Sequence, residues 1–168
     1  MPNTITLTLE SESIQYLCKK DKRLAKVIST TIERVTRHSI IRLIESKTAA
    51  CVSQAIRALQ KEYGTSFDTI FQSITSDNGS EFADLTSCLE HTATEVYYAH
   101  PFSSWERGAN EQNNGMIRRF IPKGINPQSV TPEMVRRVET WLNHYPRKVL
   151  GYASSFDVFY QYTSSHAA

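Results

Sequence analysis

From about Thr30 onward, short apolar runs suited to strands alternate with longer segments in which apolar residues recur at helical spacing. The runs TTIERVTR and SIIRLIE predict two strands joined at Arg37 and His38, and Thr48 is placed to cap a helix after them. Further strands are expected at 70–75 and 95–102, and further helices at 82–89, 103–120, 132–145 and 154–162. This order of elements predicts an α/β or α+β layered domain, with helices packed on a sheet.

The segment before Thr30 follows a different pattern. TITLTL (4–9) alternates polar and apolar side chains, which is typical of a half-buried strand. In residues 14–28 the apolar side chains fall on one helical face opposite KKDKR, which predicts a helix. With 168 residues and no internal repeat, the chain is expected to form one domain with a sizeable core.

Two functional classes are disfavoured by composition. No apolar run approaches the roughly 18 to 20 residues that span a bilayer, and the N-terminus lacks the basic and apolar regions of a signal peptide. Cys18, Cys51 and Cys88 are odd in number and lack metal-ligand spacing. Reduced thiols in a cytoplasmic protein with no membrane partner are therefore expected.

The charge is unevenly distributed along the chain. Up to Glu111, 12 Lys and Arg residues face 14 Asp and Glu residues, whereas from Gln112 to Gly151 there are 7 basic residues against 2 acidic ones. Neutralisation of phosphates supplies most non-specific affinity for nucleic acids. The basic C-terminal third therefore suggests a polyanion partner, with a merely solvated basic face as the alternative.

The stretch ITSDNGSEF (74–82) runs from an apolar strand directly into the carboxylate of Asp77. Asn78 and Gly79 supply a turn, and an Asx-type turn accounts for SDNG taken alone. The functional alternative is a metal ligand at the end of a buried strand. That alternative requires a second carboxylate.

Glu111 offers that carboxylate on the helix expected at 103–120. It shares a helical face with Gly108 and Gly115, and Asn114 lies on the same side. Each glycine inside a helix costs up to about 1 kcal/mol relative to alanine, which makes sense if a bulky phosphodiester approaches Glu111. A solvated glutamate with incidental glycines is the alternative. Paired carboxylates suit Mg²⁺, although in-line phosphoryl transfer by two ions usually uses at least three.

Three motifs carry a resemblance to a known family. SDNG-x-EF, HPFSSWERGANEQNNGMIRRFIPKG and LNHYPRKVLGY resemble the C-terminal part of DDE transposases, above all the bacterial insertion-sequence transposases whose integrase core is related to retroviral integrases. The resemblance covers about 32–160. The family's second and third catalytic acids correspond to Asp77 and Glu111, and the separation between these two positions matches the family's spacing.

The resemblance implies an RNase H-like fold and metal-dependent DNA cleavage and strand transfer, the chemistry of DNA transposition, integration and recombination. Water and then a 3′-hydroxyl would attack a DNA phosphodiester, with Mg²⁺ or Mn²⁺ held by Asp77 and Glu111. The implied partners are element ends and target DNA, a second copy of the chain, or an intact transposase. His100 and Trp105 are expected to shape the site, with packing and capping as alternative roles. The expected DNA contacts are Arg107, Asn110, Asn114, Arg118, Arg119, Lys123, Arg147 and Lys148.

The chain departs from this family near its N-terminus. The first catalytic Asp belongs near Leu17, upstream of Glu33, where no carboxylate stands in a strand context. Glu10, Glu12 and Asp21, in that order, are the candidate replacements. The helix-turn-helix region that normally precedes the core is not recognised. We therefore expect an integrase core incomplete at its first strand, where TITLTL could fill the gap without supplying an Asp.

Residues 1–28 instead resemble, faintly, the start of a DNA glycosylase in the run IQYLCKKDKRLAKVIS. The predicted division is an atypical segment 1–28, foreign to the family, followed by the C-terminal portion of a catalytic core at 29–168. Two functions stay open. One is a truncated transposase or integrase core, and the other is a catalytically inactive remnant that binds DNA or an intact transposase.

Overall fold

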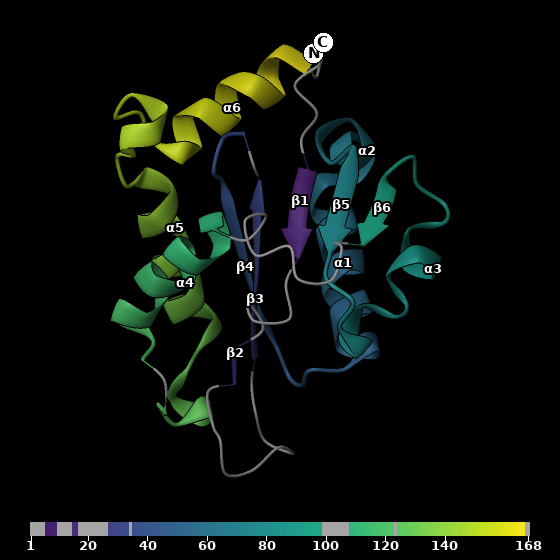
Figure 1. Ribbon diagram of the computed structural model, residues 1–168, viewed down its shortest axis with the longest axis horizontal. Helices are drawn as coiled ribbons and strands as arrows, with labels where there is room; N and C mark the ends of the chain where they lie inside the picture. Colours follow the sequence, from purple (N-terminus) through teal and green to yellow (C-terminus); the bar gives the residue numbers. More distant parts are fainter. Residues whose placement is uncertain are drawn as a thin grey trace.

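A mixed sheet forms the centre of the molecule (Figure 1). Strand β1 (Thr6–Leu9) lies between β3 (Val27–Glu33), to which it is antiparallel, and β5 (Ser73–Ser76), to which it is parallel. Leu9 is paired with Ser76, so β1 and β5 end at the same edge of the sheet. The computed structural model describes residues 6–9, 15–16, 27–33, 35–98, 108–122 and 124–166.

The remaining strands extend this arrangement on both sides. β6 (Glu95–Tyr98) pairs parallel with β5, while β2 (Gln15–Tyr16) and β4 (Ser39–Ile44) pair antiparallel with β3. The β3–β4 connection turns at Arg37, whose φ of 62° is left-handed. The two predicted strands that meet at Arg37 and His38 are therefore confirmed.

Helices cover the sheet on both faces, and α6 crosses one end (Figure 1). Residues of β4 therefore contribute to two apolar clusters, one on each face of the sheet. Ile40 and Ile44 belong to the first cluster, and Ile41 belongs to the second. The first cluster includes residues of α1, α2 and α3, and the second includes residues of α4 and α5. The predicted layered α/β architecture is confirmed. The helices are α1 (Ala49–Tyr63), α2 (Phe67–Ile70), α3 (Leu85–Leu89), α4 (Gly108–Phe120), α5 (Pro132–His144) and α6 (Ser155–His166).

Two helix starts follow directly from local sequence. The side chain of Thr48 accepts a hydrogen bond from the Cys51 N–H at 3.3 Å, which caps α1. The side chain of Thr131 accepts a hydrogen bond from the Met134 N–H at 3.2 Å, which caps α5, and Pro132 lies in the first turn of that helix. None of the described helices combines the length and the apolar character needed to cross a membrane.

The free edge of β4 is covered by side chains of α5. The amide of Asn143 accepts from the Ser39 N–H and donates to the Ser39 carbonyl, both at 2.8 Å. One turn earlier, Glu139 accepts from the Ile41 N–H at 2.6 Å. Buried backbone groups need partners, and a bare edge invites pairing with another chain. Two α5 side chains one turn apart thus take the place of a neighbouring strand.

The N-terminal expectations have mixed outcomes. Strand β1 confirms the strand predicted at TITLTL and occupies the central place, so the sheet is filled there. None of its four residues carries a carboxylate. The helix predicted at 14–28 is wrong at Gln15–Tyr16 and Val27–Ile28, which form strands because β3 and its partners supply hydrogen bonds that local periodicity cannot reveal. The division at 28/29 stays a prediction, although β1 and β2 both hydrogen-bond to β3.

His38 lies at the junction of the sheet and α6. Its ring stacks on Phe159 with a centroid separation of 4.1 Å and is almost fully buried. Burial, with smaller contributions from the positive charges of Arg147, Arg42 and His144, lowers the pKa of His38 to about 4. The native chain therefore resists a proton that the unfolded chain accepts near pH 6.5.

This difference predicts acid sensitivity. Stability should fall as the pH drops from about 6.5 to about 4, and His38 should account for about 3 kcal/mol of that loss. His38→Phe should flatten the profile in this window, measured as the free energy of unfolding by urea at pH 7 and pH 4. His91, whose side chain is 90% exposed, gives the matched control His91→Phe, whose profile should follow the wild type. Equal profiles for His38→Phe and wild type would contradict the assignment.

Candidate active site

Asp77 follows the last residue of β5 and is half-exposed. Its Oδ1 accepts a hydrogen bond from the Gly79 N–H at 3.1 Å, so the Asx turn expected from SDNG is present. Because β1 and β5 are parallel, Asp77 lies at the edge of the sheet where both strands end. Ligands of open α/β sheets commonly bind at the carboxyl ends of strands. Asp77 therefore forms an Asx turn at an edge of the sheet of the kind where ligands commonly bind.

Gly79 is closely packed and has an ordinary extended conformation, with φ −66° and ψ 140°. A Cβ at this position would lie 2.7 to 2.8 Å from the carboxyl group of Glu81. Glu81 is 3% exposed, and its Oε1 lies 2.8 Å from Lys47 Nζ. A carboxylate this deeply buried needs a partner charge, and Lys47 supplies one from the β4–α1 connection. The SDNG turn is thereby tied to the start of α1.

Glu111 belongs to α4, a helix that contacts β3 and α5. The side chains at 108–111, including Asn110 and Glu111, lie outside the described part of the structure. So do residues Arg107, Lys123, His100, Trp105, Glu10, Glu12 and Asp21. The predicted pairing of Asp77 with Glu111, and of either with a third acid, is therefore not tested by side-chain geometry.

The remaining predicted DNA contacts fall into two groups. Arg118, Arg119 and Lys148 are exposed, as phosphate contacts must be. Asn114 is 5% exposed and Arg147 is half-buried. The guanidinium of Arg147 donates to Asn113 Oδ1 at 3.0 Å and to the Leu142 carbonyl at 3.4 Å. Asn114 and Arg147 are thus integrated into the protein interior.

Within the described residues, no group of three His, Cys, Asp or Glu side chains is arranged to hold a metal ion. Asp77 places a carboxylate at the shared edge of β1 and β5. Its chemistry suits a hard cation such as Mg²⁺, which binds through oxygen and retains water ligands. Asp77 is the one predicted metal ligand whose side chain the structure describes.

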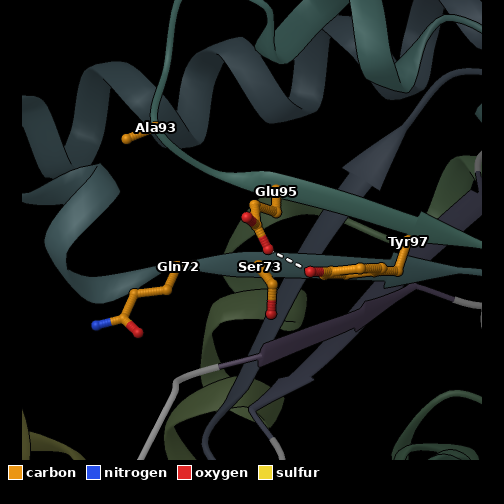
Figure 2. Close-up of a pocket in the computed structure, with 5 residues that line it drawn as sticks. All are labelled: Gln72, Ser73, Ala93, Glu95 and Tyr97. Atoms are coloured by element: carbon orange, nitrogen blue, oxygen red, sulfur yellow. Dashed lines mark hydrogen bonds between the residues drawn. The ribbon is translucent and has the colours of Figure 1, made fainter. Parts of the chain in front are cut away.

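A polar hollow of about 410 Å³ lies elsewhere, at the starts of β5 and β6. Figure 2 shows its five lining residues, with the Tyr97 hydroxyl directed at Glu95, to which it donates a hydrogen bond. This hydrogen bond and the negative charge of Glu95 raise the pKa of Tyr97. Ser73 lies in this hollow four residues before Asp77, about 13 Å away along a strand. The hollow is therefore separate from the acidic edge.

The buried polar residues that sequence reasoning did not single out include Glu81, Asn113 and Asn143. All three stand inside motifs that carry the family resemblance, and their residue types alone do not indicate that they are interior. Asn113 and its neighbour Asn114 are both buried in a polar helix segment, and Asn113 makes long-range contacts with Ser39 and Arg147. For Asn113 and Asn143, the available signal would have been a polar residue at a position that the helical period assigns to the buried face.

The packing at Gly79 gives a stability prediction. Gly79→Ala should cost about 1 to 3 kcal/mol in the free energy of unfolding, because the added methyl group meets the buried Glu81 carboxyl. In a Glu81→Ala background the same change should cost under about 0.5 kcal/mol, a coupling that urea denaturation of all four proteins would measure.

Gly115 provides the control, because a Cβ there meets nothing within 4 Å. Gly115→Ala lies within α4 and should stabilise the chain by up to about 1 kcal/mol. If the costs of Gly79→Ala and Glu81→Ala in the free energy of unfolding simply add in the double variant, the contact between position 79 and Glu81 is not the cause of the destabilisation.

Several known proteins are similar to this chain in sequence, although no family model matches it. A transposase of insertion sequence element IS4351 from Bacteroides fragilis is 38% identical over 135 residues, covering 80% of this chain and 40% of the relative. A probable transposase of insertion-like sequence element IS1161 from Streptococcus salivarius is 36% identical, covering 79% and 36%. The transposase InsI of IS30C from Escherichia coli K12 is 31% identical, covering 78% and 33%. The chain thus spans less than half the length of each of these relatives.

Solved structures share its fold. The catalytic core domain of BIV integrase matches with a TM-score of 0.70 at 13% identity, covering 98% of this chain and 99% of the core. A simian T-cell lymphotropic virus intasome structure, in complex with a PP2A regulatory subunit, contains a chain that matches with a TM-score of 0.71 at 14% identity, covering 95% of this chain and 55% of that one. The RNase H-like integrase fold is confirmed. The chain is thus similar in sequence to bacterial insertion-sequence transposases and shares the fold of retroviral integrase catalytic cores.

Proposed function

We propose that this chain is the catalytic core of a DDE transposase and acts in metal-dependent cleavage and strand transfer of DNA. The observation that carries the proposal is the position of Asp77. It stands at the carboxyl end of β5, beside the central strand of an integrase fold, in a chain that is 38% identical to a transposase. Glu111 follows on α4 at the family's spacing.

Asp77 and Glu111 are the proposed ligands of Mg²⁺ or Mn²⁺. When bound, such ions activate a nucleophile and stabilise charge on a transferring phosphoryl group. The half-exposed carboxylate of Asp77 can bind an ion while its Asx turn keeps it at the strand end. The buried Glu81, which forms an ion pair with Lys47, lies next to that turn in the sequence, and its carboxyl group is the one that Gly79 approaches.

DNA is the proposed partner, both as element ends and as target. Arg118 and Arg119 lie exposed in the last turn of α4, C-terminal to Glu111, and Lys148 lies exposed after α5. These three are the proposed phosphate contacts, together with Arg107, Asn110 and Lys123. Such contacts position a duplex without reading its sequence. Assembly with a second copy or with an intact transposase is part of the same proposal.

Activity of the isolated chain requires a third acid, and Glu10 is the first candidate. Leu9 is paired with Ser76, and the residues that follow these two in the sequence are Glu10 and Asp77. The carboxylate would then come from the residue after the strand, since β1 itself offers only threonine and leucine. Glu12 and Asp21 stand further along the chain from this edge.

A catalytically inactive remnant is the second candidate function. The lack of a carboxylate within β1 favours it. Such a chain would bind DNA through its exposed basic residues or pair with an intact transposase. Retention of DNA that weakens with salt, without cleavage, would identify this behaviour.

Metal binding tests the proposal without requiring turnover. Asp77→Asn and Glu111→Gln should each weaken Mn²⁺ binding roughly tenfold or more, because each removes a charged oxygen ligand. Calorimetric titration of the full chain measures this. Nicking of the element's end sequence in Mg²⁺ or Mn²⁺ is the activity measurement, and Glu111→Gln should abolish it.

Asp84, an acid in the connection before α3, gives the matched control Asp84→Asn, which should leave Mn²⁺ affinity unchanged. Glu10→Gln separates the two candidate functions, since its loss of nicking would identify the third acid. Equal nicking by Glu111→Gln and wild type would rule out the assignment of Glu111.

A further inference from the structure

A buried polar cluster joins α4 to the sheet and to α5. Asn113 of α4, 1% exposed, donates from its amide to the hydroxyl of Ser39 at the start of β4. Ser39, fully buried, is also held through its backbone by Asn143 of α5. One serine is therefore the meeting point of β4, α4 and α5.

Arg147 closes this cluster from the segment after α5. Its Nη1 donates to the Oδ1 of Asn113 at 3.0 Å. The Asn113 side chain therefore has a partner at its NH₂ group, which donates to Ser39, and at its oxygen, which accepts from Arg147. Its Nη2 reaches the Leu142 carbonyl at 3.4 Å, near the end of α5. A guanidinium presents donors in a rigid planar fork, so two fixed acceptors define its orientation.

The backbone around Arg147 is equally constrained. Its N–H donates to the Ala153 carbonyl at 3.1 Å, and its carbonyl accepts from the N–H groups of Leu150 and Tyr152, both at 2.9 Å. The segment PRKVLGY therefore folds into a closed loop that turns Arg147 toward α4. Its neighbour Lys148 is exposed. Adjacent basic residues thus have opposite environments.

We propose that Arg147 is a positioning residue for Glu111, acting through Asn113, and that it makes no DNA phosphate contact. This inference rests on the proposed function insofar as Glu111 is a metal ligand. Asn113 follows Glu111 by two positions on one helix, and successive helical residues are rotated by a fixed angle. Holding Asn113 against Ser39 and Arg147 therefore sets the rotation of α4 about its axis, and with it the direction of position 111.

The need for such a clamp follows from the sequence of α4. Gly108 and Gly115 lower its helix propensity on the Glu111 side. The apolar contacts of α4 in the second cluster come from Met116 and Ile117, both C-terminal to Glu111, and Ile121 follows just after the helix. Among the contacts that the structure describes between α4 and the rest of the protein, those of Asn113 thus lie close to Glu111 in the sequence, two residues after it. A ligand displaced by about 1 Å can lose most of its effect in a reaction of this kind.

Paired substitutions of neighbouring residues test the proposal in the full chain. Arg147→Met should accelerate hydrogen exchange of the amides at 113–117 about tenfold, leave α1 amides unchanged, and leave the salt dependence of DNA binding unchanged. Lys148→Met should leave hydrogen exchange in α4 unchanged. It should make the slope of log affinity for DNA against log salt concentration shallower by about 0.9, because one phosphate contact is lost. Mn²⁺-induced broadening of the Glu111 amide signal should require several-fold more Mn²⁺ in Arg147→Met.

Substitutions at Asn113 give a second route. Asn113→Asp keeps an oxygen for Arg147 and can accept from the Ser39 hydroxyl, so its α4 exchange should stay within about twofold of wild type. Asn113→Leu removes both contacts and should behave as Arg147→Met. These two variants decide the matter if Arg147→Met does not fold.

Two outcomes would overturn the proposal. One is a salt slope reduced by about 0.9 in Arg147→Met with normal exchange in α4, which would make Arg147 a phosphate contact. The other is equal acceleration of exchange in α1 and α4, which would mean a general loss of stability. If the wild-type chain shows no Mn²⁺ broadening, the proposed function fails, while the exchange comparison still decides whether Arg147 positions α4.

Discussion

The free edge of β4 is the constraint on which the C-terminal half of the structure depends. A strand paired on one side only must bury or cover its outward backbone groups. Here the Asn143 side chain hydrogen-bonds to the backbone N–H and the backbone carbonyl of Ser39, and Glu139 accepts from the Ile41 N–H. Helix α5 is therefore bound to β4 by hydrogen bonds in addition to apolar packing. Burial raises the pKa of Glu139 although the Ile41 N–H and Arg42 act against that shift. Once α5 is placed in this way, the position of α4 follows.

The edge of β4 is also connected, through hydrogen bonds, to the helix that carries Glu111. Asn143 fixes Ser39, Ser39 accepts from Asn113, and Asn113 stands two residues after Glu111. On the other side of the sheet, the Lys47–Glu81 pair and the close approach of Gly79 shape the turn that carries Asp77. The two proposed metal ligands are therefore each supported by a buried polar contact that lies close to them in the sequence.

Local chemistry predicted much of this fold. The caps at Thr48 and Thr131 involve contacts within a few residues, so their sequence patterns are sufficient to place α1 and α5. The pairing of β1 with β5 joins segments that lie far apart in the sequence, Leu9 with Ser76, and no periodicity encodes it. Arg147 shows the same limit at the level of function. A basic residue beside Lys148 suggests phosphate, and only the distant Asn113 reveals its internal role.

The central strand illustrates how a fold and its chemistry can be separated. A strand in this place needs backbone hydrogen bonds to both neighbours and side chains that suit a pleated surface, and Thr6–Leu9 meets both requirements with threonine and leucine alone. Neither requirement calls for a carboxylate. The architecture therefore places no demand for a carboxylate on β1, whereas a metal site does require one, because its ligands act through charge at a fixed position. Conservation of the fold is thus weaker support for activity than a carboxylate at the shared end of β1 and β5.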